Sequence, residues 1–199
     1  SLFRELEFKK MLREVDEQAP APAGHDTTVH IVETGREADA LQARLRGASA
    51  TAIMCWAQGS AEAVVLAFAV DAGEAWVVSL NRQAVADARW PWLVSWLADP
   101  SARKIGHDLK TAMRRLARLG LSLEGISGDT MIAAYLLNPA RTEQRLTDVA
   151  DEYIGRQLRE PFQPSAARGN GAQLEFSAGL SEDTAQACGR AVCAVPGLH

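Results

Sequence analysis

Residues 104–139, with the sequence KIGHDLKTAMRRLARLGLSLEGISGDTMIAAYLLNP, decide how the rest of the chain is interpreted. Lys104–Gly106 has the character of a short strand, and Asp108 stands where a helix N-cap belongs. Gly120 provides a C-terminal stop. A helix is therefore predicted between these two residues, with apolar positions at helical spacing: Leu109, Ala112, Met113, Leu116 and Leu119.

The second half of this stretch predicts another helix. An apolar step over residues 121–126 leads to Asp129, which is a second N-cap candidate. Pro139 ends the helix, because a residue that precedes proline is disfavoured in the helical conformation. The apolar residues that carry this helix are Met131, Ile132, Tyr135 and Leu136.

Upstream, the pattern changes from helical to extended. Thr28 to Glu33 alternates like a strand, and a helix around Leu41 and Leu45 ends at Gly47. Three apolar segments then predict consecutive strands over 51–57, 63–70 and 74–80. Their nearly continuous apolar character favours a sheet covered on both faces. The predicted fold class is therefore α/β, with a mixed sheet flanked by helices.

Helices are predicted on either side of the central stretch and at the end of the chain. One covers Asp87 to Ala98 with Pro91 in its first turn, and one covers Thr147 to Ile154 and ends at Gly155. Ser181 is expected to cap a last helix. Between these elements, residues 156–179 are typical of a loop.

The N-terminal residues indicate a domain boundary. Residues 1–17 contain an amphipathic helical pattern, and 18–27 contain an Ala/Pro linker. The predicted domain therefore covers residues 28–199.

Composition limits the function classes. The chain has 199 residues and a formal net charge of −4, from 21 basic and 25 acidic residues. A domain that binds nucleic acid unaided usually has an excess of basic residues. If this chain contacts DNA, a neighbouring domain is therefore expected to provide most of the binding affinity. No apolar run reaches the ~20 residues of a membrane span. The three cysteines are interpreted as reduced core thiols of a cytosolic protein, and the spacing of Cys188 and Cys193 argues against a zinc site.

The central stretch also carries a family resemblance. The patterns G-x-x-L-K-x-x-x-x-x-L-A-x-x-G and G-I-x-x-D-T-M-x-x-x-Y-L-L-N resemble the 3′–5′ exonuclease (proofreading) domain of bacterial family A DNA polymerases. This resemblance implies a ribonuclease H-like fold. It also implies a site for two divalent metal ions ~3.5–4 Å apart, held by four carboxylates on a strand, on the helix after G-x-x-L-K and on the last helix.

In this chain the positions that match those carboxylates are not acidic. The strand match is Trp56 and Gln58, and the helix after G-x-x-L-K carries Ala112. On the last helix, Ala187 matches a tyrosine and Ala191 an aspartate. Shifting the alignment does not help, because residues 48–61, 109–119 and 184–199 contain no acidic residue. The site is therefore expected to be vestigial, with no catalytic residues, metal or other cofactor.

Two alternatives stay open at this point. The first is an active nuclease that uses displaced acids such as Asp108, Asp129 or Glu62. The second is a stand-alone nucleic-acid-binding module that uses a basic stripe on the central helix, formed by Lys110, Arg114 and Arg118. His107 is interpreted as a surface or capping residue.

The resemblance implies a place within a larger protein. The expected function is an inactive exonuclease-like domain that supports DNA-templated DNA synthesis and repair without proofreading. The expected partners are a 5′-nuclease domain before Ser1, a polymerase domain after His199, and DNA bound through that polymerase. A monomeric, nucleoid-associated cytoplasmic protein without membrane contact is expected.

Overall fold

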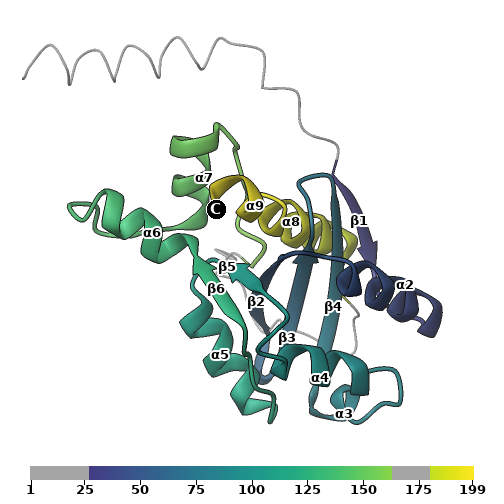
Figure 1. Ribbon diagram of the computed structural model, residues 1–199. Helices are drawn as coiled ribbons and strands as arrows, with labels where there is room; N and C mark the ends of the chain where they lie inside the picture. The colour runs from purple at the N-terminus through teal and green to yellow at the C-terminus, as the bar shows by residue number, and fades with distance from the viewer. Residues whose placement is uncertain (1–26, 163–179) are drawn as a thin grey trace, which may run out of the picture.

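A six-stranded mixed sheet forms the centre of the molecule in the computed structural model, which describes residues 27–162 and 180–199 (Figure 1). The strand order is β1-β4-β3-β2-β5-β6. The pairs formed by β3 with β2 and β4 are antiparallel, and the other three are parallel. The strands are β1 (Thr28–Ile31), β2 (Thr51–Gln58), β3 (Ser60–Ala69), β4 (Glu74–Asn81), β5 (Lys104–Gly106) and β6 (Ile126–Asp129).

Helices cover both faces of this sheet and extend past one edge. They are α2 (Gly35–Arg46), α3 (Arg82–Val85), α4 (Pro91–Ala98), α5 (Leu109–Arg118), α6 (Thr130–Leu137), α7 (Leu146–Ile154), α8 (Glu182–Val192) and α9 (Val195–Leu198). Within the described ranges, no helix is long and apolar enough to cross a membrane.

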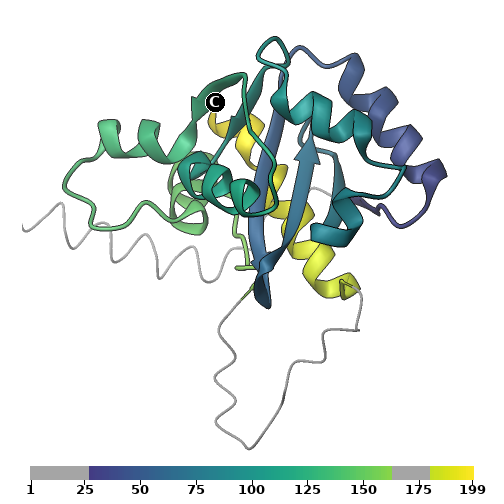
Figure 2. The ribbon, with the colours of Figure 1, turned by 90° about the horizontal axis from the view of Figure 1, so that it is seen from below.

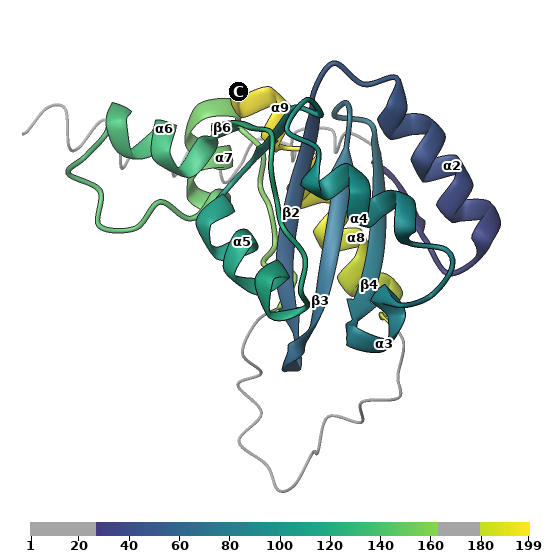
Figure 3. The same cartoon turned by 60° about the horizontal axis from the view of Figure 1, so that its bottom comes forward.

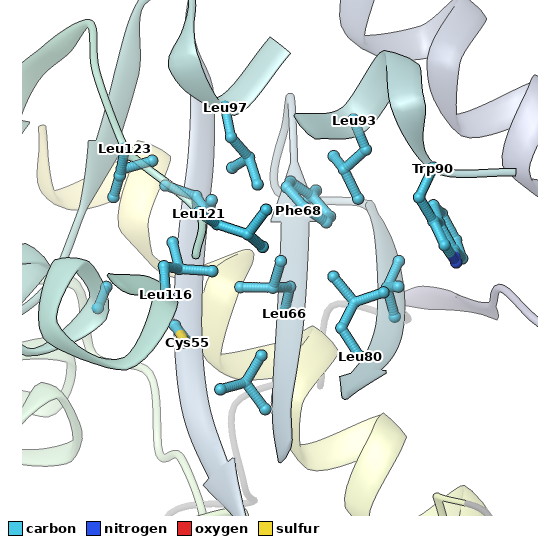
Figure 4. Close-up of a cluster of buried hydrophobic side chains, with 14 of the residues drawn as sticks. Cys55, Leu66, Phe68, Leu80, Trp90, Leu93, Leu97, Leu116, Leu121 and Leu123 are labelled. Atoms are coloured by element: carbon cyan, nitrogen blue, oxygen red, sulfur yellow. The ribbon is translucent and has the colours of Figure 1, made fainter. Parts of the chain in front are cut away.

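The alternation of side chains along β2, β3 and β4 produces two apolar layers. On one face, α2, α4 and α5 pack over the sheet (Figure 3). Figure 4 shows Leu66 and Phe68 of β3 among leucines of α4 and α5, and Phe68 is fully buried. On the other face, α8 packs against Val65, Ala67 and Val77. The prediction of a sheet covered on both faces is therefore confirmed.

The helices α6, α7 and α9 gather near the β6 edge of the sheet, where Leu146 of α7 and Val195 of α9 join the apolar cluster beneath α8. In Figures 1 and 2, α6 extends outward from the β6 edge, away from the sheet. The short helices α7 and α9 lie near it, and α9 ends the chain at this side of the molecule.

Most predicted elements are confirmed, with a few corrections. The strand at Lys104–Gly106 and the caps Asp108 and Asp129 are as predicted. The helix expected from Asp87 begins instead at Pro91, because the Asp87 carboxylate binds Arg89 and holds a turn. The short elements α3 and β6 were not predicted, and the last predicted helix is interrupted after Val192.

Some sequence predictions fall outside what the structure describes. The helical segment within 1–17 and the linker before residue 27 are among them. For the predicted loop, only residues 156–162 are described, and they form neither helix nor strand. All three cysteines are buried and free, as expected of core thiols.

Candidate functional site at the end of strand β2

The carboxyl-terminal half of β2 has an edge without a strand partner in the described structure. β2 pairs with β5 only over Thr51–Ile53, because β5 is three residues long. Beyond that point the chain of β5 has already turned into α5, which packs beside β2. We call this place, lined by residues 54–58 and α5, the β2 notch.

An arginine occupies the β2 notch. Arg115 on α5 is half-buried, and its Nη1 donates a hydrogen bond to the carbonyl oxygen of Cys55. This bond satisfies a strand-edge acceptor that β5 is too short to reach. Sequence reasoning missed Arg115, because its spacing on α5 does not distinguish it from the other basic residues of that helix.

The two strand positions predicted for the site lie on the α8 side of the sheet. Trp56 is half-buried and packs against the apolar cluster beneath α8. Gln58 follows a register shift in the β2–β3 pairing, and its Oε1 accepts a hydrogen bond from Ser79 Oγ at 2.5 Å. Both side chains therefore have structural contacts within the sheet.

The helix positions are buried alanines on opposite sides of the sheet. Ala112 packs with Cys55 and Leu116 in the cluster under α4 and α5. Ala187 and Ala191 are buried on α8.

The structure brings only some of the predicted positions together. Trp56 and Ala191 line one hollow of about 20 Å³, and Ala112, Gln58 and Ala187 are not part of its lining. A hollow of this size has room for about one water molecule.

The charges around the β2 notch do not favour a cation. Burial raises the pKa of the Cys55 thiol to about 12, although the nearby Arg115 charge opposes this rise. The thiol is therefore neutral at physiological pH and is a poor metal ligand. Among the described residues, no group of three or more histidine, cysteine, aspartate or glutamate side chains is placed to hold a metal ion.

Two aspartates lie at the adjoining junction, where β5 leads into α5 and β6 leads into α6, and the carboxylate of Asp129 contacts the backbone of Asp108. Asp129 Oδ1 accepts hydrogen bonds from the N–H groups of Asp108 (3.1 Å) and Met131 (2.9 Å). Its Oδ2 accepts one from the N–H of Leu109 (2.8 Å). One carboxylate thus binds the N-termini of two helices, where the helix dipoles favour negative charge.

Asp108 is the N-cap of α5. Its Oδ1 accepts a hydrogen bond from the N–H of Thr111 at 3.3 Å. Its φ of 56° lies in the left-handed region, which aspartate tolerates better than most residues do. Glu62 is exposed on β3, and the described structure does not gather it with Asp108 and Asp129 into a metal-binding group.

His107 belongs to the same junction. Its Nδ1 lies 2.9 Å from Thr130 Oγ1, and its Nε2 lies 2.8 Å from the carbonyl oxygen of Gln144. The interpretation as a surface residue was wrong, because His107 is buried. Burial lowers the pKa of its imidazole, while the bond to Gln144 and the charges of Asp129 and Asp108 oppose that shift.

The basic stripe faces outward on α5. Lys110, Arg114 and Arg118 are exposed, whereas Arg115 turns toward β2. The backbone carbonyl of Arg118 accepts a hydrogen bond from Arg82 at 3.0 Å, which links α5 to α3.

Comparison with known proteins identifies the family to which this fold belongs. The family described as the ribonuclease H-like domain of DNA polymerase I matches residues 57–161, more than half of the chain. The chain belongs to this family. The match includes β3 to α7, and it confirms both the predicted ribonuclease H-like fold and the DNA polymerase I resemblance.

Relatives of this family are much longer than the chain. DNA polymerase I of Mycobacterium tuberculosis is 43% identical over 67 residues, which are 34% of this chain and 7% of the relative. DNA polymerase I of Pseudomonas aeruginosa is 29% identical over 88% of this chain and 22% of its own length. A solved structure of the POL domain of Pol1 from M. smegmatis, in complex with DNA primer-template and dNTP, superposes with a TM-score of 0.60 at 27% identity. The superposition covers 85% of this chain and 26% of that one.

Proposed function

We propose that this domain is a catalytically inactive 3′–5′ exonuclease-like domain of a DNA polymerase I, which supports DNA synthesis and repair without proofreading. The observation that carries the proposal is the content of the β2 notch. An arginine guanidinium is bound to the β2 edge there, and Trp56 and Ala112 pack as apolar side chains. Ala191 is buried on α8, on the other face of the sheet from Ala112.

The residues present do not fit a pair of Mg²⁺ ions. Magnesium prefers hard oxygen ligands, and two divalent ions close together need several carboxylates. Residues 54–58 of β2 and the whole of α5 provide none. Arg115 adds a fixed positive charge at the same place, which repels a divalent cation over several ångströms.

The hydrogen bonds of the acidic residues Asp108 and Asp129 do not favour the hypothesis that they are displaced metal ligands of an active nuclease. Both oxygens of Asp129 accept backbone hydrogen bonds, and the side chain of Asp108 caps α5. A metal ion bound there would compete with these bonds for the carboxylate oxygens, and Asp129 Oδ1 already accepts two of them. The acidic pair is therefore interpreted as structural.

The test is a nuclease assay on the purified 199-residue protein. A 5′-labelled single strand is incubated with the protein and Mg²⁺ or Mn²⁺, beside a control that contains EDTA. We expect no metal-dependent shortening in either case. Shortening that follows the protein through purification and stops with EDTA would contradict the proposal, and Asp108 and Asp129 would then be the residues to replace.

A second role, which can coexist with the first, is contact with the DNA that the polymerase holds. The exposed row of Lys110, Arg114 and Arg118 on α5 favours it. Phosphate contacts give affinity that falls steeply with salt. Reversing Lys110 and Arg114 to glutamate should weaken binding of the domain to single-stranded DNA and flatten its salt dependence, measured by fluorescence anisotropy. Unchanged binding of the variant to single-stranded DNA would contradict this role.

A further inference from the structure

The helix α6 presents apolar side chains to solvent along its outer side. The exposed large hydrophobic side chains are Leu136 (73%), Leu137 (71%), Ile132 (55%), Tyr135 (54%) and, on the adjacent α7, Tyr153 (42%). The buried positions of α6 are the small residues Thr130 and Ala134. The helix therefore turns its smaller side chains inward and its larger ones outward, the reverse of an ordinary surface helix.

A shallow groove adjoins these side chains. It has a volume of about 120 Å³, and its lining includes Leu137 of α6, Tyr153 and Ile154 of α7, and Leu198 of α9. Ligand and cofactor sites usually measure about 300–1,000 Å³, so this groove is too small for them. Its size suits one large apolar side chain of a partner, which is how protein interfaces are commonly anchored.

The chemistry of this surface selects a protein partner over a nucleic acid. Residues 130–138 carry no charged side chain, and no charged residue lines the groove. DNA and RNA are bound mainly through cations that pair with phosphates. Exposed apolar patches on soluble domains instead indicate contact with another protein surface.

We propose that the α6–α7 surface, formed by Ile132, Tyr135, Leu136, Leu137 and Tyr153, is where this domain docks on the polymerase region of the same DNA polymerase I chain. The inference rests on the proposed function and adds the surface through which the domain acts. Two observations favour the polymerase region as the partner of this surface. The matched polymerase structure from M. smegmatis extends far beyond the 26% that this fold covers. Leu198 of the last helix lines the groove, so a chain that continued past His199 would leave the domain beside this surface.

The first test compares amide hydrogen exchange in two proteins. One is the 199-residue chain, and the other is the complete DNA polymerase I that carries this domain in its source organism. We expect exchange in α6 and α7 to be slower in the complete protein, by about tenfold or more, while exchange in α2 stays the same. Equal rates in both proteins would overturn the docking inference.

Substitutions separate docking from folding. Leu136→Lys with Leu137→Lys changes two exposed positions, and Met113→Lys changes an exposed apolar residue of α5 as the matched control. We expect all variants of the 199-residue chain to melt within a few degrees of the parent. In the complete polymerase, only the α6 variant should lose the exchange protection of α7. Retained protection in that variant would contradict the inference.

A different partner at the α6–α7 surface, or failure of the proposed function, would each give a distinct experimental result. If a second copy of this chain covers α6, sedimentation of the 199-residue protein will show a dimer that the Leu136→Lys, Leu137→Lys variant loses, and the docking inference is overturned. If the source organism encodes no polymerase region with this domain, the proposed function fails as well. If the complete polymerase exists and does not proofread, yet α6 stays unprotected, only the docking inference fails.

Discussion

Two neighbouring regions of this domain use side-chain charge in opposite ways. In the β2 notch, Trp56 and Ala112 stand at positions that the sequence resemblance matches to carboxylates of proofreading exonucleases, and Arg115 binds the strand edge. At the junction of β5–α5 and β6–α6, acidic residues are present, and Asp129 uses both carboxylate oxygens on backbone N–H groups. Figure 3 shows α5, which carries residues of both regions, beside β2.

The difference shows why the presence of acidic residues does not make a metal site. A metal-binding carboxylate directs its oxygens at the metal and has acidic neighbours that do the same, whereas the carboxylates of Asp108 and Asp129 accept hydrogen bonds from backbone N–H groups at helix N-termini. The aspartates of the junction are capping carboxylates. Under the proposed function, the β2 notch has lost its metal-binding carboxylates. Replacing all of them avoids leaving carboxylates that repel one another when no metal is bound.

The largest effect is expected from removing the capping carboxylate. Asp129→Ala should lower the free energy of unfolding by about 3–4 kcal/mol, because three backbone N–H groups at two helix N-termini lose a charged acceptor. Urea denaturation followed by circular dichroism measures the loss. Asp129→Asn, which keeps one acceptor oxygen, should lose about half as much. A loss below about 1 kcal/mol for Asp129→Ala would mean that this carboxylate is not structural.

The next effect comes from placing a carboxylate in the β2 notch. Ala112→Asp should cost about 2–3 kcal/mol at neutral pH, because Ala112 is 2% exposed and the new charge would be buried. The loss should shrink as the pH falls and the carboxyl group becomes protonated. Ala112→Asn is the control for size without charge. Recovery of stability by Mg²⁺ or Mn²⁺ in Ala112→Asp, and not in Ala112→Asn, would show that the notch still accepts a metal.

A smaller effect is expected at Arg115. Arg115→Met keeps much of the apolar stem and removes the donor to the Cys55 carbonyl, so we expect a loss of about 1–2 kcal/mol. The exposed neighbour Arg114→Met is the matched control and should change stability by less than about 0.5 kcal/mol. Equal effects of the two changes would show that the guanidinium in the notch has no structural role.

The smallest effect is a pH dependence at the junction. Burial lowers the pKa of His107, so below about pH 6.5 the unfolded chain binds a proton that the folded protein resists. Stability should therefore decrease as the pH falls through that value, until the folded imidazole is also protonated. The stability of His107→Gln should decrease less over this window than that of the parent. A steeper decrease in His107→Gln would reverse the assigned direction of the pKa shift.

Local patterns in the sequence are enough to predict most helices and strands of the domain. Asp108 and Asp129 were recognised as caps because each aspartate stands directly before an apolar helical repeat, which is the position of an N-cap. The strands β2, β3 and β4 follow from apolar runs separated by turns, whereas β6 lacks such a run and was not predicted. These features depend on residues close together in the chain, so propensity and spacing suffice to predict them.

The candidate site depended more on contacts between distant residues. Arg115 meets Cys55 across 60 positions, and nothing in the helix repeat marks it. His107 was misjudged because its partners Thr130 and Gln144 come from elements further along the chain. On α6, apolar spacing predicted the helix correctly but could not reveal that Leu136 faces outward.

The most direct test of the central claim is a titration of the purified domain with Mn²⁺, followed by electron paramagnetic resonance of the free ion. An inactive site predicts that the free Mn²⁺ signal rises in proportion to the metal added, as it does in buffer alone, into the millimolar range. Loss of that signal in proportion to the protein would contradict it, above all if Trp56→Ala or Arg115→Met, and not Arg114→Met, changed the affinity.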